Sequence, residues 1–276
     1  MGNGLVINTN VSALNTTRIL RRSTFSLNKS LERLSSGLRI NRAADDAAGL
    51  AIAENLRSRV IGAQVAARNS QDGVSLVQIA EGALGEITNV LQRIRELSVQ
   101  AANGTNSAQN RADLQAEVVE LRDSVTEILL RTEFNGLNPF AAIAGGLVLQ
   151  TGADAASTTA ITSLGTLFNT TNLAINAVDI STQAGASGAI TSVDTGLAIL
   201  NTKRAALGAT QNSLEFTINV LGIQEENSLA AESAIRDADI ARETIGFTRA
   251  QILVSAGTSI LAQANIVPQT ALQLLG

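Results

Sequence analysis

Residues 27–38 read LNKSLERLSSGL, and this stretch decides the fold of the chain's N-terminal part. Its leucines recur at spacings of four, three and four residues, which places them on one face of an α-helix. Near the other end, large apolar residues recur every seven residues. Such stripes are unstable in water until another helix covers them, so we expect the two ends to contact each other, copies of themselves, or both. The predicted assembly contacts are Leu27, Leu31, Leu34 and Leu38, and in the second stripe Leu253, Ala256, Ile260 and Val267.

The composition favours helices packed at close range. Hydrophobic residues make up 45% of the 276 residues, but aromatic residues only 2%, so the core must consist mainly of Ala, Leu, Ile and Val. The chain contains no Cys and no His, which excludes disulfides, thiolate nucleophiles, a Ser-His-Asp triad and His-ligated zinc. We therefore expect neither an enzyme nor a resident metal or cofactor.

Charge and hydropathy argue against nucleic-acid and membrane partners. The net charge is −4 and the pI is about 5.0, so a general nucleic-acid footprint is not expected. We find no run approaching the ~18 apolar residues that span a bilayer, and expect no membrane insertion. The first basic side chain is Arg18, without the charged and apolar regions of a signal peptide before it. If the protein leaves the cell, we expect it to do so without a cleaved signal peptide.

Hydrophobic spacing predicts three long helices in the N-terminal half. The first begins at about Ser12, a plausible N-cap, and ends near residues 37–38. The second is expected over 47–102, where Asn103-Gly104 is a helix-stop signal, and the third begins near Ser107. The turn of about four residues between the last two predicts an antiparallel helix pair.

Two charged clusters in this half have alternative interpretations. Asp45 and Asp46 are expected to cap the second helix, because their charge suits a helix N-terminus. A catalytic acid pair is the less favoured alternative, since nothing nearby supplies a polar partner. Arg18, Arg21 and Arg22 indicate a solvated face of the first helix, or a contact with another subunit.

The middle of the chain, residues 140–188, is rich in Ala, Gly, Thr and Ser and carries little charge. Two short β-prone runs, 147–151 and 158–162, flank a Gly-Ala-Asp turn at 152–154 and predict a β-hairpin. Its Ser and Thr side chains are plain strand and turn residues, or glycan acceptors on the exposed face.

The C-terminal part is predicted to be helical again. The helical region begins near Ala189 and continues with breaks to about Asn265. Asp237-Ala238-Asp239 indicates a break or a new cap rather than a metal loop, which would need a longer acidic pattern with a central Gly. Pro268 is expected to close the helix.

Several segments in both parts of the chain resemble bacterial flagellins. Their shared order and spacing are far more specific than one short motif. The N-terminal matches are LSSGLRIN (34–41), DDAAGLAIA (45–53), QDGVSLVQ (71–78) and RIRELSVQ (93–100), and the C-terminal matches are SAIRDADIA (233–241), LAQAN (261–265) and PQTAL (268–272).

The resemblance implies a mainly α architecture. Residues 1–43 with 237–276 would form an inner terminal coiled-coil domain. Residues 44–236 would form an outer helical bundle with a β-hairpin near 145–165, without the large central domains of many flagellins. The implied function is that of a secreted, extracellular structural subunit, which self-assembles into the flagellar filament and transmits motor torque for swimming.

The resemblance also implies partners. These are copies of the chain, an export chaperone, the filament cap, junction proteins and Toll-like receptor 5 of a host. Positions that match the receptor contact of many flagellins are Gln92, Arg93, Leu97 and Glu117. The alternative is that Arg93 and Glu117 form an ordinary surface or inter-subunit pair.

The C-terminal end matches a region that in flagellins engages an export chaperone or a host sensor. The residues concerned are Leu272, Leu274 and Leu275. The alternative is simply the end of the inner coiled coil, and the absence of a basic terminal residue argues against sensor recognition.

Two other functions compete with a filament subunit. A hook–filament junction protein has similar terminal helices, but the run AAGLAIA at 47–53 and the QAN at 263–265 favour the filament protein. A flagellin-like surface binding protein is the other alternative, against which the scarcity of aromatic side chains argues.

Overall fold

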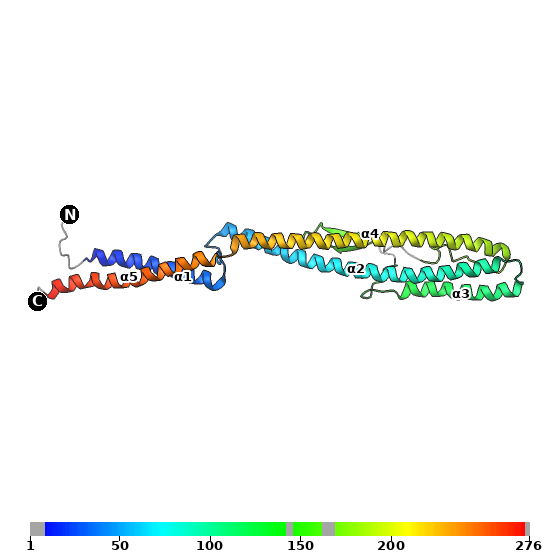
Figure 1. Ribbon diagram of the computed structural model, residues 1–276, viewed down its shortest axis with the longest axis horizontal. Helices are drawn as coiled ribbons and strands as arrows, with labels where there is room; N and C mark the ends of the chain where they lie inside the picture. The colour runs from blue at the N-terminus through cyan, green and yellow to red at the C-terminus, as the bar shows by residue number, and fades with distance from the viewer. Residues whose placement is uncertain (1–8, 142–145, 162–168, 274–276) are drawn as a thin grey trace. The chain divides into compact units, whose positions relative to one another are not determined.

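The computed structural model describes residues 9–141, 146–161 and 169–273 (Figure 1). Within these residues the chain forms five α-helices and one antiparallel two-stranded sheet. This confirms the predicted mainly α fold with one small β-hairpin. The elements are α1 (Val11–Ser36), α2 (Ala47–Ala102), α3 (Ala108–Arg131), β1 (Leu147–Gln150), β2 (Thr158–Ile161), α4 (Gln183–Arg236) and α5 (Ile240–Gln273).

The chain divides into two compact units, which are described separately. The first unit comprises residues 1–58 and 227–276, and the second comprises residues 59–226. Both α2 and α4 therefore contribute to each unit. The predicted domain boundaries, at 43/44 and 236/237, lie instead near the breaks between α1 and α2 and between α4 and α5, and they stay a prediction.

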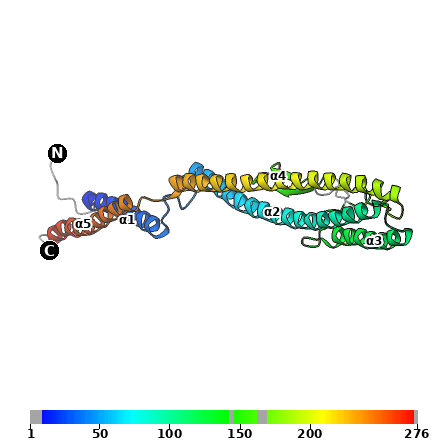
Figure 2. The same ribbon diagram turned by 45° about the vertical axis from the view of Figure 1, so that its right-hand side comes forward.

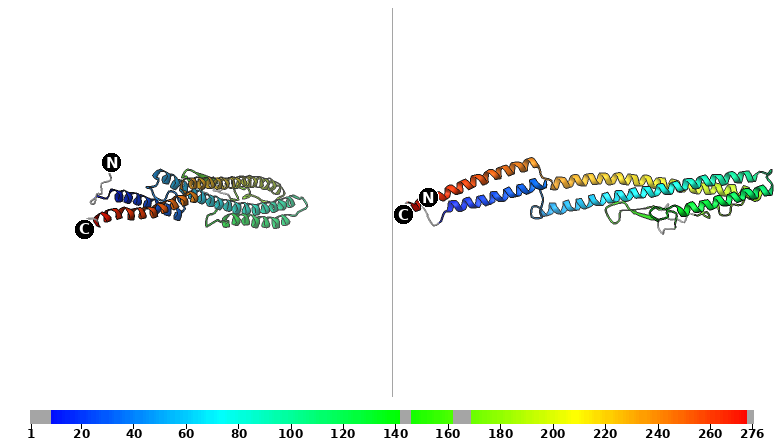
Figure 3. Two further views of the ribbon diagram at one scale, coloured as in Figure 1. Left: turned by 60° about the vertical axis from the view of Figure 1, so that its left-hand side comes forward. Right: turned by 90° about the horizontal axis from the view of Figure 1, so that it is seen from below.

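In the first unit, α1 and α5 lie side by side and antiparallel (Figure 2 and Figure 3). The N-cap of α1 is Asn10, whose side-chain oxygen accepts a hydrogen bond from the Ala13 amide at 2.9 Å. The predicted N-cap, Ser12, is thus wrong, because a capping side chain is available two residues earlier. The helix ends at Gly37, which has φ +72° and so adopts the left-handed conformation typical of a helix C-terminus.

Helix α5 continues through Pro268 to Gln273, so the predicted closure at Pro268 is wrong. A proline inside a helix cannot donate a hydrogen bond to the carbonyl four residues earlier, here that of Ala264. The Asn10 side-chain amide donates to this carbonyl at 2.8 Å. Asn10 thus caps α1 and also supplies the hydrogen bond that Pro268 cannot make.

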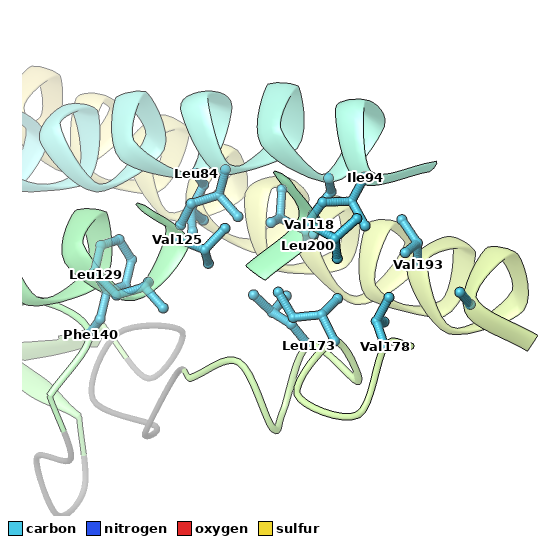
Figure 4. Packing of buried hydrophobic residues seen from close by; sticks show 14 of the residues in the cluster. Leu84, Ile94, Val118, Val125, Leu129, Phe140, Leu173, Val178, Val193 and Leu200 are labelled. Atoms are coloured by element: carbon cyan, nitrogen blue, oxygen red, sulfur yellow. The ribbon is translucent and has the colours of Figure 1, made fainter. Parts of the chain in front are cut away.

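In the second unit, the core lies where α2, α3 and α4 pack together with residues 173–180 (Figure 4). Each helix contributes one apolar face at helical spacing, and burying one such Leu or Ile side chain stabilises the fold by about 1.5–3 kcal/mol. Figure 4 shows Leu84, Val125, Leu173 and Leu200 pointing toward one another from four parts of the chain. The seven-residue repeat on α4 is completely buried: Leu200, Leu207, Leu214 and Leu221.

The β-hairpin lies against α2, and two glycines of this helix, Gly62 and Gly73, permit the close approach. Leu147 pairs with Ile161 and Gln150 with Thr158 in antiparallel register. A Cβ added at Gly73 would lie 2.3 Å from the Leu149 side chain. The close approach explains why a long helix tolerates glycine here despite its low helix propensity.

Helix α4 begins at Gln183, six residues before the predicted start near Ala189. Thr182 accepts a hydrogen bond from the Gly185 amide at 3.0 Å and satisfies one donor of the first turn. Gly185 and Gly188 obscure this turn in the sequence, because glycine disfavours helix interiors. Tertiary packing overrides that preference, as Ala186 is fully buried in the core.

Candidate assembly surfaces

The contact between α1 and α5, which we call the inner seam, alternates small buried residues with larger half-buried ones such as Leu27 and Val254. On α1 the buried positions are Ser23 and Ser30, and on α5 they are Ala250 and Gly257. A Cβ added at Gly257 would lie 3.2 Å from the Leu20 side chain, so the two helices approach closely at this point. Sequence reasoning identified Leu27 and Leu34 of this seam but missed its small residues, because these carry little hydropathy signal. Their seven-residue spacing on both helices was the available clue.

Other large apolar side chains of the same pair lie outside the inner seam. On α5, Ile252, Leu253 and Ile260 are exposed, with Ile260 at 57%. On α1, Phe25 and Leu31 are exposed, with Leu31 at 56%. We call these two sets the outward faces. A helix that is apolar on more than one side is stable in water only if further helices cover it.

The structure therefore separates the predicted assembly contacts into two groups. Leu27 and Leu34 are half-buried on the α1 side that faces α5, whereas Leu31 is exposed. Leu253, Ala256 and Ile260 are all exposed on α5. Leu38 lies just beyond α1, and Val267 lies in α5.

The breaks before α2 and before α5 are joined backbone to backbone. Leu38 and Asp237 form an isolated β-bridge, and the amide of Ala238 donates to the carbonyl of Gly37 at 2.9 Å. Salt bridges flank the bridge: Arg236 lies 3.1 Å from Glu54, and Arg33 lies 3.6 Å from Glu243. These contacts hold the start of α5 beside the end of α1.

Of the two aspartates expected to cap α2, one does so and the other forms a salt bridge. Asp46 accepts a hydrogen bond from the Gly49 amide at 2.9 Å, which confirms it as a cap of α2. Asp45 lies 2.8 Å from the Lys29 ammonium group. The hydrogen bond from Lys29, with those from the amides of Arg42 and Asn41, lowers the Asp45 pKa from its ordinary value of 3.8 to about 2.

The predicted receptor residues lie on α2 and α3 in the second unit. The Arg93 guanidinium donates two hydrogen bonds to one carboxylate oxygen of Glu117, at 2.8 and 2.9 Å, and these raise the Arg93 pKa. Gln92 is exposed beside them. Leu97, in contrast, is only 1% exposed and packs in the core, where it supports α2 from below the surface.

Other predicted features can be placed more briefly. Leu272 lies in the last turn of α5, and Leu274 and Leu275 lie outside the described residues. Within the described ranges no group of three or more acidic side chains could hold a metal ion. Arg18, Arg21 and Arg22 are all exposed on α1.

One segment of α5, Ile240–Ile266, is apolar enough to cross a membrane by length and composition, with a mean hydropathy of 1.2 in its best window. The segment contains no unbroken apolar run of that length, because polar residues and glycines interrupt it, and the expectation of no membrane insertion stays a prediction. Only 11% of that window is buried. The segment carries the outward face of α5.

Comparison with known proteins places these helices in a family. Residues 7–145 match the bacterial flagellin N-terminal helical region, and residues 190–275 match the bacterial flagellin C-terminal helical region. A flagellin of Halalkalibacterium halodurans is 44% identical over 271 residues, covering 98% of this chain and 100% of that protein. A flagellin of Bacillus subtilis is 43% identical, with 98% and 99% covered. A 31.3 kDa flagellar filament core protein of Treponema maltophilum is 39% identical, with 98% and 100% covered.

The matches extend over nearly the whole length of these flagellins and filament core proteins. This favours a filament subunit over a junction protein or a surface binding protein. The mainly helical fold and the paired chain ends agree with both matched helical regions. The chain therefore belongs to the bacterial flagellins and is a structural subunit of the flagellar filament.

Proposed function

We propose that the outward faces of α1 and α5 are the surfaces through which the first unit joins other subunits in the filament. The single observation that carries the proposal is the position of Leu253 and Ile260. They repeat at coiled-coil spacing, yet they lie exposed, because other residues of α5, among them Ala250, Val254 and Gly257, form the inner seam. Covering them with helices from other copies would remove large apolar side chains from water.

The arrangement fits an open polymer better than a closed dimer. Exposed apolar residues occur on more than one side of the pair, with Ile245 and Ile252 on α5 and Phe25 on α1. Different surfaces that contact different neighbours generate a helical filament when the rotation between copies does not close a ring. The α1–α5 pair thus presents the different apolar surfaces that contacts with several neighbouring subunits require.

The substitution Ile260→Asp tests this proposal. Ile260 is exposed in the single chain, so we expect the purified chain to keep its helix content. We expect the critical concentration for filament growth on seeds to rise at least tenfold, which corresponds to about 1.4 kcal/mol. The measurement is sedimentation of filaments with electron microscopy.

Thr258→Asp is the matched control, because it places the same charge at an exposed polar position of α5. We expect this variant to assemble nearly as well as the unmodified chain. Normal assembly of Ile260→Asp, or equal loss in both variants, would refute the role of the outward face.

We also propose that Gln92, Arg93 and Glu117 form the contact with Toll-like receptor 5 that the flagellin resemblance implies. Support comes from their exposure and from the Arg93–Glu117 pair, which presents a fixed guanidinium on the surface. Binding of the receptor's soluble ectodomain to Arg93→Ala is the test, and undiminished binding would contradict it.

Finally, we propose that the chain is exported without a cleaved signal peptide and that its C-terminal end binds an export chaperone. The cap and junction proteins are further proposed partners. Support comes from the flagellin membership and from the exposed apolar surface of α5, which needs cover before assembly. Deleting residues 272–276 should abolish co-purification with the chaperone, and retention of the complex would place the contact elsewhere.

A further inference from the structure

The charges of the chain are unequally distributed between its ends and its middle. Residues 1–36 and 240–276 contain seven basic and two acidic residues, a net charge of +5. Residues 37–239 contain 13 basic and 22 acidic residues, a net charge of −9. The total of −4 therefore conceals a basic part of the chain, formed by α1, α5 and their flanking residues. This part attracts anionic partners that the middle of the chain repels.

Most of this positive charge lies on α1, where arginines share a face with large apolar side chains. Two arginines and three apolar residues recur at alternating spacings of three and four residues, which places them on one side of the helix. We call this set the basic stripe: Val11, Leu14, Arg18, Arg21 and Phe25. All five residues are exposed, with Phe25 at 70%. Ser23 and Ser30, which are buried against α5, lie on the opposite side of α1, so the basic stripe is left uncovered.

The terminal helices have few carboxylates that could neutralise these arginines. Helices α1 and α5 contain one acidic residue each, Glu32 and Glu243. Both already have a partner, because Glu32 lies 2.8 Å from Arg42 and Glu243 lies 3.6 Å from Arg33. The terminal helices of other copies could therefore cover the apolar members of the basic stripe but not neutralise its guanidinium groups.

The alternation of arginine with large apolar residues matches the surface of an anionic membrane. Lipid phosphates supply a dense layer of negative charge for the guanidinium groups. The boundary of the acyl chains, a short distance below, accepts the apolar side chains. Nucleic acid also offers phosphates, but it gives large aliphatic side chains little to contact, and Phe25 is the single aromatic residue of α1 that could stack on a base. The basic stripe thus favours a lipid surface.

We propose that the basic stripe of α1 binds the surface of an anionic membrane in the unassembled chain, with α1 lying in the plane of the interface. The inference goes beyond the filament role, since it concerns chains that have not joined a filament. It agrees with the expectation of no membrane insertion, because an interfacial helix lies on a bilayer and does not cross it.

Flotation of the unassembled chain with lipid vesicles tests this inference and separates bound chains from filaments, which do not float. Vesicles of equal parts phosphatidylcholine and phosphatidylglycerol are compared with vesicles of phosphatidylcholine alone. We expect at least tenfold tighter binding to the anionic vesicles, and weaker binding when added salt shortens the Debye length from about 10 Å to about 3 Å. Equal affinity for both kinds of vesicle, or equally tight binding of single-stranded DNA, would overturn the proposal.

A charge variant with a matched control locates the contact. The double variant of Arg18→Gln with Arg21→Gln should bind the anionic vesicles at least tenfold more weakly, because each arginine at such a surface contributes a factor of about five. Arg57→Gln with Arg59→Gln removes the same charge from exposed positions of α2 and should bind nearly as well as the unmodified chain. An equal loss in both double variants would refute a specific role of the basic stripe.

An apolar variant tests the second component of the contact independently. Phe25→Ser should weaken vesicle binding about tenfold, because it removes the largest apolar side chain of the basic stripe from the interface. Phe216→Ser is its control, since Phe216 on α4 is also 70% exposed but lies in the acidic middle of the chain. Unchanged melting temperatures should show that the variants are folded, and undiminished binding of folded Phe25→Ser would contradict the proposal. Ile260→Asp tests assembly through α5, whereas these variants test lipid binding through α1, so each proposal can fail without the other.

Discussion

Replacing Gly196 by alanine sets two known effects against each other within one helix. Gly196 is buried in α4, and a Cβ there would lie 2.5 Å from the carbonyl oxygen of Leu173. Alanine favours a helix over glycine by about 1 kcal/mol. Overpacking a close contact costs about 1–3 kcal/mol, and a backbone atom cannot rotate away as a side chain can.

The carbonyl of Leu173 is also poorly able to move. Leu173 and Ile175 are almost completely buried, and Ala174 between them has φ +59°, an uncommon conformation for a residue with a Cβ. Backbone hydrogen bonds of 3.0–3.1 Å hold this segment in place. We therefore expect an overpacking cost near the upper end of its range, from which the gain in helix propensity is subtracted. The net effect of Gly196→Ala should be a free energy of unfolding lowered by about 1–2 kcal/mol.

Gly208→Ala is the matched control, because a Cβ at Gly208 in the same helix would meet no atom within 4 Å. We expect that variant to gain about 0.5–1 kcal/mol. The assay is urea unfolding of the dilute, unassembled chain, followed by circular dichroism at 222 nm. Both glycines lie in the second unit, so the same transition should move in opposite directions. A Gly196→Ala chain as stable as the unmodified protein would refute the argument.

Two further predictions concern the first unit. Asn10→Ala should destabilise the α1–α5 pair by about 1–2 kcal/mol in urea unfolding, because it removes a helix cap and leaves the Ala264 carbonyl without its donor. Asn15→Ala should have little effect, since its side chain bonds only to exposed Arg18 in the described structure, and an equal loss in both would contradict the role of Asn10. Because folding lowers the Asp45 pKa, its stabilising effect should be fully present above pH 4 and lost as the pH falls toward 2. In urea unfolding from pH 6 to pH 2, the free energy of unfolding of Asp45→Asn should depend less on pH than that of the unmodified chain. An unchanged pH dependence would show that the Lys29–Asp45 pair does not cause it.

Much of the fold could be predicted because local signals and packing agree. The bounds of α2 follow from clean apolar spacing and from the Asn103-Gly104 stop. The hairpin follows from two β-prone runs around a glycine-containing turn. In these segments the residues that favour a conformation are also those that the core requires.

The errors occur where tertiary contacts replace a missing local signal. Pro268 normally ends a helix, but a side chain from the other end of the protein completes its hydrogen bonding. Thr182 and the buried Ala186 start α4 although glycines follow. Neither the distant donor nor the neighbouring core can be identified from local sequence.

The orientation of the C-terminal stripe illustrates a deeper difficulty. Leu253 and Ile260 repeat at coiled-coil spacing in α5, yet within the single chain the helix buries a second stripe against α1, formed by Ala250, Val254, Gly257 and Leu261. Apolar periodicity shows that a face will be covered but not which molecule covers it. For a polymer subunit, one of two such stripes can belong to the contact between copies.

The same division between inner-seam residues and outward-facing residues explains why assembly and folding can be separated by mutation. In α5 the inner seam positions Ala250 and Gly257 set how closely the two helices of one chain approach, whereas Ile260 makes no comparable contribution to the single chain. A charge at Ile260 should therefore act on the critical concentration while sparing the melting temperature. A methyl group added at Gly257 should act on the chain's own helix pair first, and on assembly only through it.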